Sequence, residues 1–289
     1  MNWFPAPGKL NLFLHVLGRR ADGYHLLQTV FRLIERSDRV GIAMRSDGEI
    51  RRHDPLPGVP QEEDLCVRAA RLLQQRCGTR QGADIALEKN LPIGGGLGGG
   101  SSDAATTLVV LNRLWHAGLA RGELQALGAQ LGADVPFFVF GENALGEGIG
   151  ERLSALALPA AWYLVLVPPV ALSTAEVFSD NALTRNTKPL KIPPFFSGLG
   201  ANDLEAVALK RSPQIAAHLQ WLRSRRPQAR MTGAGACVFA EFATEVEARA
   251  VLGELPGAMR GFVARGLDRH PLHGFSCSEF DPLGSRQVG

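Results

Sequence analysis

The sequence predicts a two-domain α+β protein. Three observations favour this fold class: the length of 289 residues, the hydrophobic fraction of 45%, and an alternation of segments with strand-like and helix-like hydrophobic periods. At about 150 residues per domain, this length suits one large domain or two ordinary ones. We expect an N-terminal mixed α/β domain over residues 1–155 and a C-terminal α+β domain over residues 156–289.

Strands are expected at the start of the chain. Apolar runs at 10–16 and 26–34 predict two strands. Segments 40–44 and 50–53 flank an Asp-Gly turn signal at 47–48, which predicts that they pair as a hairpin.

Helix signals follow. Acidic residues at 62–64 precede an apolar helical face that ends before Gly78, and this pattern predicts a helix. A short alternating strand is expected at 83–88. Two more helices are expected over 101–115 and 123–131.

The second half of the chain again contains segments with a strand-like hydrophobic period and segments with a helix-like one. The predicted elements are strands at 148–152, 162–167, 237–242 and 262–264, and helices that begin at Pro213 and after Thr244. The polar, proline-bearing segment 185–194 predicts a mobile loop. The tail after residue 270 has no period and is expected to be loose; we assign no role to residues after 273.

The composition excludes several classes of protein. Lys and Arg total 31 against 28 Asp and Glu, and this net charge of +3 is too small to indicate nucleic-acid binding. The longest apolar stretch, 156–172, contains three prolines and is shorter than the ~20 residues of a membrane-spanning helix. The N-terminus has no secretory pattern, and the four cysteines form no C-x-x-C pair. We therefore expect a cytoplasmic protein that binds neither nucleic acid nor membrane.

A glycine-rich segment carries the main functional signal. It consists of Pro92, Ile93, Gly94, Gly95, Gly96, Leu97, Gly98, Gly99, Gly100, Ser101 and Ser102. Ordering so many glycines costs backbone entropy, and an anion bound by backbone N–H groups at the start of the following helix would offset that cost. The alternative is a flexible hinge or a tight turn packed against the sheet.

Two common phosphate motifs do not fit this segment. Gly94, Gly96 and Gly99 match the spacing G-x-G-x-x-G, but a dinucleotide-binding fold needs a second strand after the helix, and here another helix follows. A P-loop ends in Gly-Lys-Ser/Thr, and no lysine stands at that place.

Segment 92–102, followed by Asp-Ala-Ala at 103–105, resembles the phosphate-binding motif of the GHMP kinases. Two further motifs of that family stand in the expected order: Pro-Gly-Lys-Leu-Asn-Leu at 7–12 and the second glycine motif at 231–237. The resemblance spans 5–272. It implies the two-domain GHMP kinase fold, with an N-terminal nucleotide-binding domain and a ferredoxin-like C-terminal domain, and it implies ATP and Mg²⁺ as co-substrate and metal.

The resemblance implies a catalytic role for Asp134, which by itself could be a helix N-cap. Lys9 alone would be a solvated charge, but strand alternation places Lys9, Asn11 and Phe13 on one face. Our hypothesis is that Asp134 accepts a proton from the substrate hydroxyl, while Lys9 keeps Asp134 ionised and balances charge on the transferred phosphoryl group.

The chain is most similar to one branch of the family, whose small-molecule substrate carries cytidine diphosphate. This similarity rests on Arg-Ala-Asp-Gly-Tyr-His at 20–25 and on segment 131–137. It implies that the substrate is bound by Asn11, Tyr24, His25, Thr174 and Phe178, with aromatic rings against the cytosine. The alternatives are a strand edge for Tyr24 and His25 and core packing for Phe178.

The chain has Asp64 where the family often carries Asn, so Asp64 either alters adenine recognition or is an acid in the first turn of a helix. The Mg²⁺ ligands are not fixed by the sequence; Ser102 is a candidate, and Glu88 a weaker one. The oligomeric state is open between a monomer and a weak homodimer. Alternative functions are another small-alcohol kinase of the homoserine or mevalonate class, or a non-catalytic nucleotide or metabolite sensor on the same scaffold.

Overall fold

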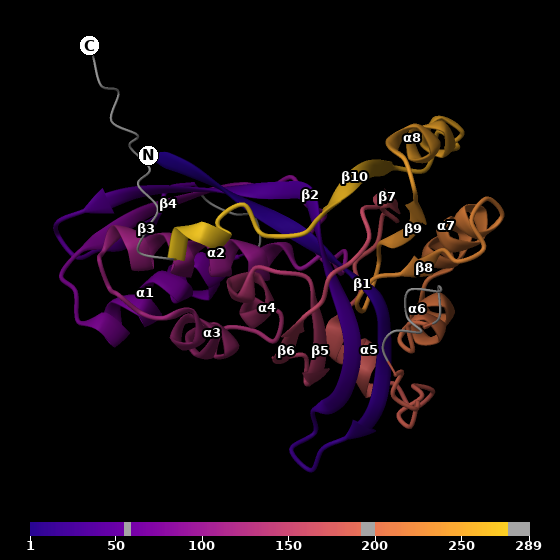
Figure 1. Ribbon diagram of the computed structural model, residues 1–289, viewed down its shortest axis with the longest axis horizontal. Helices are drawn as coiled ribbons and strands as arrows, with labels where there is room; N and C mark the ends of the chain where they lie inside the picture. Colours follow the sequence, from indigo (N-terminus) through magenta and orange to yellow (C-terminus); the bar gives the residue numbers. More distant parts are fainter. Residues whose placement is uncertain (55–58, 192–199, 277–289) are drawn as a thin grey trace.

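The computed structural model describes residues 1–54, 59–191 and 200–276. Its framework is a pair of long antiparallel strands, β1 (Asn2–Arg19) and β2 (His25–Arg45). Figure 1 shows this pair as two long indigo ribbons that run from the left of the view and bend down to a turn at the bottom. Because β2 also pairs with β4, β5 and β10, it joins strands from both halves of the chain.

The N-terminal half places helices on one side of this framework. Its further strands are β3 (Ile50–Arg52), β4 (Gly82–Glu88), β5 (Ala144–Gly148) and β6 (Arg152–Ala155). Its helices are the short η1 (Gln61–Glu63), α1 (Leu65–Cys77), α2 (Gly99–Leu114), α3 (Arg121–Ala129) and α4 (Val135–Phe140). The buried face of α2 packs against α1, α4 and β1, which makes it the central helix of this half.

The C-terminal half forms a smaller sheet, in the order β10-β7-β9-β8, covered by helices. Its strands are β7 (Trp162–Leu166), β8 (Arg230–Met231), β9 (Val238–Phe242) and β10 (Gly261–Leu267). Its helices are α5 (Thr174–Ser179), α6 (Glu205–Arg211), α7 (Pro213–Arg223) and α8 (Glu245–Gly253), and the described chain ends in η3 (His273–Ser276).

Each half has its own hydrophobic core, and a third cluster joins them. In this cluster Leu10 and Phe13 of β1 pack with Tyr163 of β7 and Phe239 of β9. The predicted two-domain α+β class is confirmed. The expected domain boundary near 154–160 stays a prediction.

Several predicted helices are confirmed with their caps. Asp64 caps α1 by accepting hydrogen bonds from the Cys66 and Val67 N–H groups, and α1 ends at Gly78, whose φ of 65° is left-handed. Thr244 likewise caps α8, and Pro213 stands at the start of α7. The short helices α4, α5 and α6 are not predicted, because six or seven residues show too little of the helical period.

Three predictions about the N-terminal half are wrong. Segments 40–44 and 50–53 do not form a hairpin, because the more buried β4 lies between β2 and β3 and pairs with both. The segment 148–152 is not one strand: Gly148 ends β5, Arg152 begins β6, and 149–151 form the turn between them. Phe13 does not share a face with Lys9, because a bulge between Asn11 and Phe13 shifts the register of β1.

The C-terminal tail also differs from its prediction. Residues 271–276 are not loose: Leu272 and Phe275 pack against the N-terminal core, and Phe275 meets Phe4 edge-on at 5.8 Å. The aromatic contact depends on one residue of the tail, Phe275, and a single residue leaves no hydrophobic period in the sequence that could predict it. Residues 185–191 of the expected mobile loop are irregular, and 192–194 lie outside the described residues, as do 277–289.

Candidate active site

A cavity of about 1030 Å³ is lined by both halves of the chain. It collects most of the residues that the sequence suggested. Those lining it are Lys9, Asn11, Tyr24, His25, Pro92, Ile93, Gly94, Gly95, Gly96, Gly98, Gly99, Gly100, Ser101, Asp134, Thr174 and Phe178. The cavity therefore has the extent of a site for a large ligand, and Lys9, Asp134 and the glycine loop supply polar groups within a mostly apolar lining.

The glycine loop is held in place through its carbonyl groups. Gly94 and Gly95 accept hydrogen bonds from the N–H groups of Ala236 and Cys237, and Leu97 accepts one from the Lys9 N–H at 2.9 Å. The Thr232 hydroxyl donates to the Gly96 carbonyl at 3.4 Å. Since the C=O and N–H of a trans peptide point in opposite directions, the N–H groups that follow these carbonyls point away from the protein that holds the loop.

Glycine is required in this loop by two close approaches. A Cβ at Gly96, where φ is 77°, would lie 2.3 Å from the Thr232 carbonyl oxygen. A Cβ at Gly98, where φ is 72°, would lie 2.9 Å from the Phe138 ring. The Thr232 backbone and the Phe138 side chain thus meet the loop at distances that only glycine permits.

The loop leads directly into the N-terminus of α2. This helix begins at Gly99, two residues earlier than predicted, with Gly98 as its N-cap. The first N–H groups of a helix have no partner within the helix, and the Gly99, Gly100 and Ser101 backbones line the cavity. Free donors and the positive end of the helix dipole are a suitable environment for phosphate oxygens.

Lys9 and Asp134 form an ion pair in the same cavity. The Lys9 Nζ atom lies 3.3 Å from Asp134 Oδ2 and donates to Asn11 Oδ1 at 2.5 Å. The lysine side chain is only 4% exposed, whereas that of Asp134 is 34% exposed, so the carboxylate is the member of the pair that a ligand can reach. Asn11 in turn donates to the Thr29 hydroxyl, which fixes the orientation of its amide.

Asp134 stands at the N-cap position of α4 but its side chain makes no capping hydrogen bond. The sequence left two interpretations open, a helix cap and a reactive carboxylate. The carboxylate pairs with Lys9 and lines the cavity, and the reactive role of Asp134 stays a prediction.

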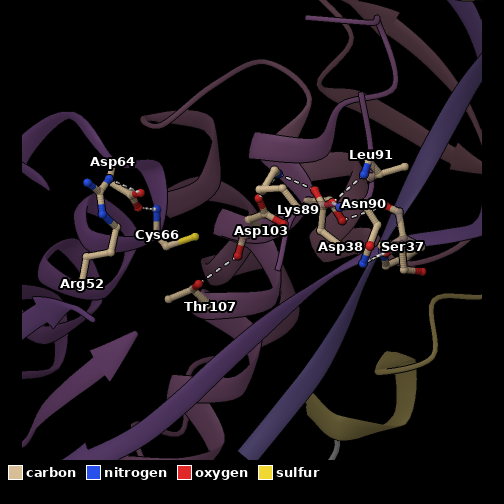
Figure 2. A network of polar contacts seen from close by, with 12 residues as sticks. Ser37, Asp38, Arg52, Asp64, Cys66, Lys89, Asn90, Leu91, Asp103 and Thr107 are labelled. Carbon is tan, nitrogen blue, oxygen red and sulfur yellow. Dashed lines mark hydrogen bonds and ion pairs between the residues drawn. The ribbon is translucent and has the colours of Figure 1, made fainter. Parts of the chain in front are cut away.

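A buried polar network fixes both ends of the glycine loop (Figure 2). Asp38 Oδ1 accepts hydrogen bonds from the Asn90 and Leu91 N–H groups, at 2.5 and 2.7 Å, just before the loop. Lys89 pairs with Asp38 and, at 2.5 Å, with Asp103 in the first turns of α2. Sequence analysis did not single out Asp38 or Lys89; a charged residue between an apolar strand and a glycine loop is the only signal that could have found Lys89.

The charged groups in this network shift one another's pKa values. Burial raises the pKa of Asp103 above its usual range, and Asp38 adds to this, although Lys89 opposes it. Burial lowers the pKa of Lys89, but the two carboxylates outweigh that effect and raise it overall. Asp103 Oδ1 is buried and has no hydrogen-bond partner among the described residues, so one acceptor of the network is still unused.

Asp64 lies at the far end of the same cavity. One of its oxygens caps α1, and the other accepts a hydrogen bond from Arg52 at 3.1 Å (Figure 2). Both oxygens are engaged by the protein, which favours the structural interpretation of Asp64 as a helix N-cap.

Aromatic residues line the opposite end. The His25 and Phe178 rings lie 5.1 Å apart, tilted by 32°, and Tyr24 is 59% exposed beside them. Burial and the neighbouring charges of Arg185 and Arg19 lower the pKa of His25, which favours the neutral form of its ring. Thr174 begins α5, the helix that carries Phe178.

Three suggested residues are not brought to the cavity. Ser102 is fully buried, and its hydroxyl donates to the Pro7 carbonyl. Leu97 belongs to the core beneath the loop. Glu88 is on the surface, where it pairs with Arg39 at 2.8 Å. Conversely, Gly233 and Ala234 of the second glycine motif line the cavity, although the sequence analysis gave them no site role.

The described residues hold no cluster of three or more His, Cys, Asp or Glu side chains that could bind a metal ion. Among them there is also no helix that could cross a membrane.

The glycine loop on a helix N-terminus, beside a lysine–carboxylate pair, defines a phosphotransferase site. Models of two families match the chain: the N-terminal domain of GHMP kinases over residues 64–142 and the C-terminal domain of GHMP kinases over residues 195–261. The chain belongs to the GHMP kinase family.

Individual relatives within this family carry the name of one particular kinase. The 4-diphosphocytidyl-2-C-methyl-D-erythritol kinase of Nitrosospira multiformis is 64% identical, over 94% of this chain and 93% of the relative. That of Thiobacillus denitrificans is 61% identical, over 94% and 98%. A crystal structure of 4-(cytidine 5'-diphospho)-2C-methyl-D-erythritol kinase matches with a TM-score of 0.81 at 33% identity, over 92% of this chain and 99% of that one.

Proposed function

We propose that this chain transfers the γ-phosphoryl group of ATP to the 2-hydroxyl of 4-diphosphocytidyl-2-C-methyl-D-erythritol. The products are the 2-phosphate and ADP, in the non-mevalonate (MEP) route to isoprenoid precursors. The substrate is supported by relatives of that name that are 56–64% identical over nearly the whole chain. The reaction class is carried by one observation: the Lys9–Asp134 pair stands in the cavity that the glycine loop lines.

The two ends of the cavity suit the two ligands. The backbone N–H groups of the glycine loop and of the start of α2 would bind the triphosphate. Tyr24, His25 and Phe178 would hold the cytosine at the other end, where a flat aromatic base gains about 1–3 kcal/mol from stacking. The reacting hydroxyl then comes between them, at the Lys9–Asp134 pair.

Asp134 would accept the proton of the substrate hydroxyl as the phosphorus–oxygen bond forms. Lys9 would keep the carboxylate ionised and stabilise charge on the transferred group, and Asn11 orients the lysine. Phosphoryl transfer has a loose transition state, so positioning and charge stabilisation contribute more than early removal of the proton.

Mg²⁺ fits this site as a companion of the triphosphate. It usually keeps several waters and takes only one or two protein ligands besides phosphate oxygens, which agrees with the lack of a three-ligand cluster among the described residues. Of the two serines at the start of α2, Ser101 lines the cavity, and its hydroxyl could contribute a ligand. When bound, the ion would neutralise charge on the phosphate oxygens.

An ATP-consumption assay tests the proposal. The purified protein is given ATP and Mg²⁺ with the cytidyl substrate, with mevalonate, with homoserine, or with no acceptor. We expect ADP only with the cytidyl substrate. ADP formation with mevalonate or homoserine instead would assign another small-alcohol kinase, and binding of ATP without turnover of any acceptor would assign a sensor.

A further inference from the structure

Arg185 and His25 make a contact that determines the protonation of the histidine ring. The Arg185 Nε–H donates to His25 Nε2 at 3.0 Å. A guanidinium group stays protonated in proteins and can only donate hydrogen bonds. His25 Nε2 must therefore be the unprotonated nitrogen, and in the neutral ring the proton is on Nδ1.

The orientation of Arg185 is itself fixed by the chain around it. Its Nη2 donates to the Phe178 and Asp180 carbonyls at 2.9 and 2.8 Å. Its Nη1 donates to the Leu183 carbonyl at 3.1 Å. Three carbonyl groups, one in the last turn of α5 and two just after it, thus hold the planar guanidinium in one position, with the remaining Nε–H directed at His25.

The other nitrogen of His25 is left for a ligand. The residue is 8% exposed and lines the cavity. Within the part of the chain that the structure describes, the only hydrogen bond of the ring is the one from Arg185. The Nδ1–H group is thus a donor with a defined position beside the Phe178 ring.

We infer that Arg185 is a positioning residue for nucleobase specificity: it holds His25 as the Nδ1–H tautomer, so that the site selects a base with an acceptor nitrogen in its ring. Cytosine has such an acceptor at N3, whereas the N3 of uracil carries a hydrogen and would face the donor of His25. Placing a donor opposite a donor leaves two polar groups unpaired, which is the strongest basis for discrimination that a site can have. The inference rests on the proposed function for the identity of the cytidyl substrate.

The tautomer can be read without any substrate. Nitrogen-15 NMR of the free protein, with the His25 signal assigned by its loss in His25→Gln, distinguishes a protonated from an unprotonated ring nitrogen. We expect an unprotonated Nε2 and a protonated Nδ1 at pH 7.5. A protonated Nε2 would overturn the inference, whatever the protein's substrate is.

The specificity is measured as a ratio. The kcat/KM for the cytidyl substrate is divided by that for the uridyl analogue, in the wild type and in Arg185→Met, Arg185→Lys and Arg211→Met. We expect Arg185→Met to lower the ratio about ten-fold, because the ring is then free to change tautomer. Lysine also donates only, so Arg185→Lys should recover most of the ratio.

Arg211→Met is the matched control. Arg211 anchors the same segment through the Asp180 carboxylate at 2.8 Å but makes no contact with His25. Its substitution should leave the ratio within about two-fold. If Arg211→Met lowers the ratio as much as Arg185→Met does, the effect comes from loss of segment anchoring and the tautomer has no role in specificity. If the wild type phosphorylates neither substrate, the proposed function fails, while the NMR result still decides the tautomer.

Discussion

Lys9 and Asp134 lie 3.3 Å apart although β1 and α4 are separated by more than a hundred residues. Asp134 occupies a helix N-cap position and yet gives its carboxylate to Lys9 and not to the helix. Leaving a helix cap unmade costs about 1 kcal/mol, so the arrangement favours chemistry over local stability.

The first prediction concerns this pair. Asp134→Asn should lower kcat by about 10²–10⁴-fold, the usual contribution of a general base, while the Kd for ATP stays within about three-fold. Lys9→Met should lower kcat by a similar factor. Steady-state kinetics and calorimetric titration with a non-hydrolysable ATP analogue measure both quantities. A turnover number near that of the wild type would remove the residue concerned from the reaction.

The second prediction concerns the glycine loop. Gly96→Ala should raise the KM for ATP at least ten-fold, because the added Cβ would lie 2.3 Å from the Thr232 carbonyl at a φ of 77°. Gly122→Ala is the control: nothing lies within 4 Å of its Cβ, and alanine in α3 should raise stability by about 0.5–1 kcal/mol. Equal KM values for the two variants would contradict the requirement for glycine.

The third prediction concerns the network behind the loop. Asp38→Asn keeps an acceptor for the Asn90 and Leu91 N–H groups but removes one of the two charges that pair with Lys89. We expect a several-fold weaker Kd for ATP and an unchanged Kd for the cytidyl substrate, since the network fixes only the loop. Asp84→Asn, which removes a partly exposed partner of Arg45, should change neither value. A parallel loss of both affinities in Asp38→Asn would indicate general unfolding.

The fourth prediction concerns pH. Burial, with help from His273 and Arg121, lowers the pKa of His270 from 6.5 to about 3. Between these values the unfolded chain binds a proton that the folded chain does not, so stability should fall as the pH falls, by about 1.4 kcal/mol per pH unit. His270→Asn should therefore lose less stability than the wild type between pH 7 and pH 5, by roughly 2 kcal/mol, in urea unfolding.

His116→Asn serves as its control. His116 is exposed, and asparagine tolerates its left-handed φ of 52°. Its stability should follow the pH dependence of the wild type. If His270→Asn also follows the wild type, the histidine is not the source of the pH dependence.

The sequence predicted the parts of this protein that rest on local signals. Capped, strongly periodic helices such as α1, α7 and α8 are examples, because a helix cap and an apolar face are written in adjacent residues. The pairing of β3 with β4 was missed, since strand order depends on contacts between distant segments. The bulge that turns Phe13 into the core was missed for the same reason.

The candidate site shows the same difference between local signals, which the sequence reveals, and contacts between distant segments, which it does not. The glycine loop is visible in eleven consecutive residues, and family resemblance suggested Lys9 and Asp134. Asp38 contacts Lys89, 51 residues away, and Arg185 contacts His25, 160 residues away. Neither Asp38 nor Arg185 has a sequence neighbour that marks it.

The Ala236 and Cys237 N–H groups donate hydrogen bonds to the Gly94 and Gly95 carbonyls, and this has a consequence for the order in which the protein folds during its synthesis. A chain still emerging from the ribosome that has not reached residue 230 lacks the Ala236 and Cys237 contacts to its own glycine loop. We expect such an incomplete chain to handle nucleotide poorly even if its first half has already folded. Competence to consume ATP would then arrive late in translation, after the residues that recognise what is to be phosphorylated have been made.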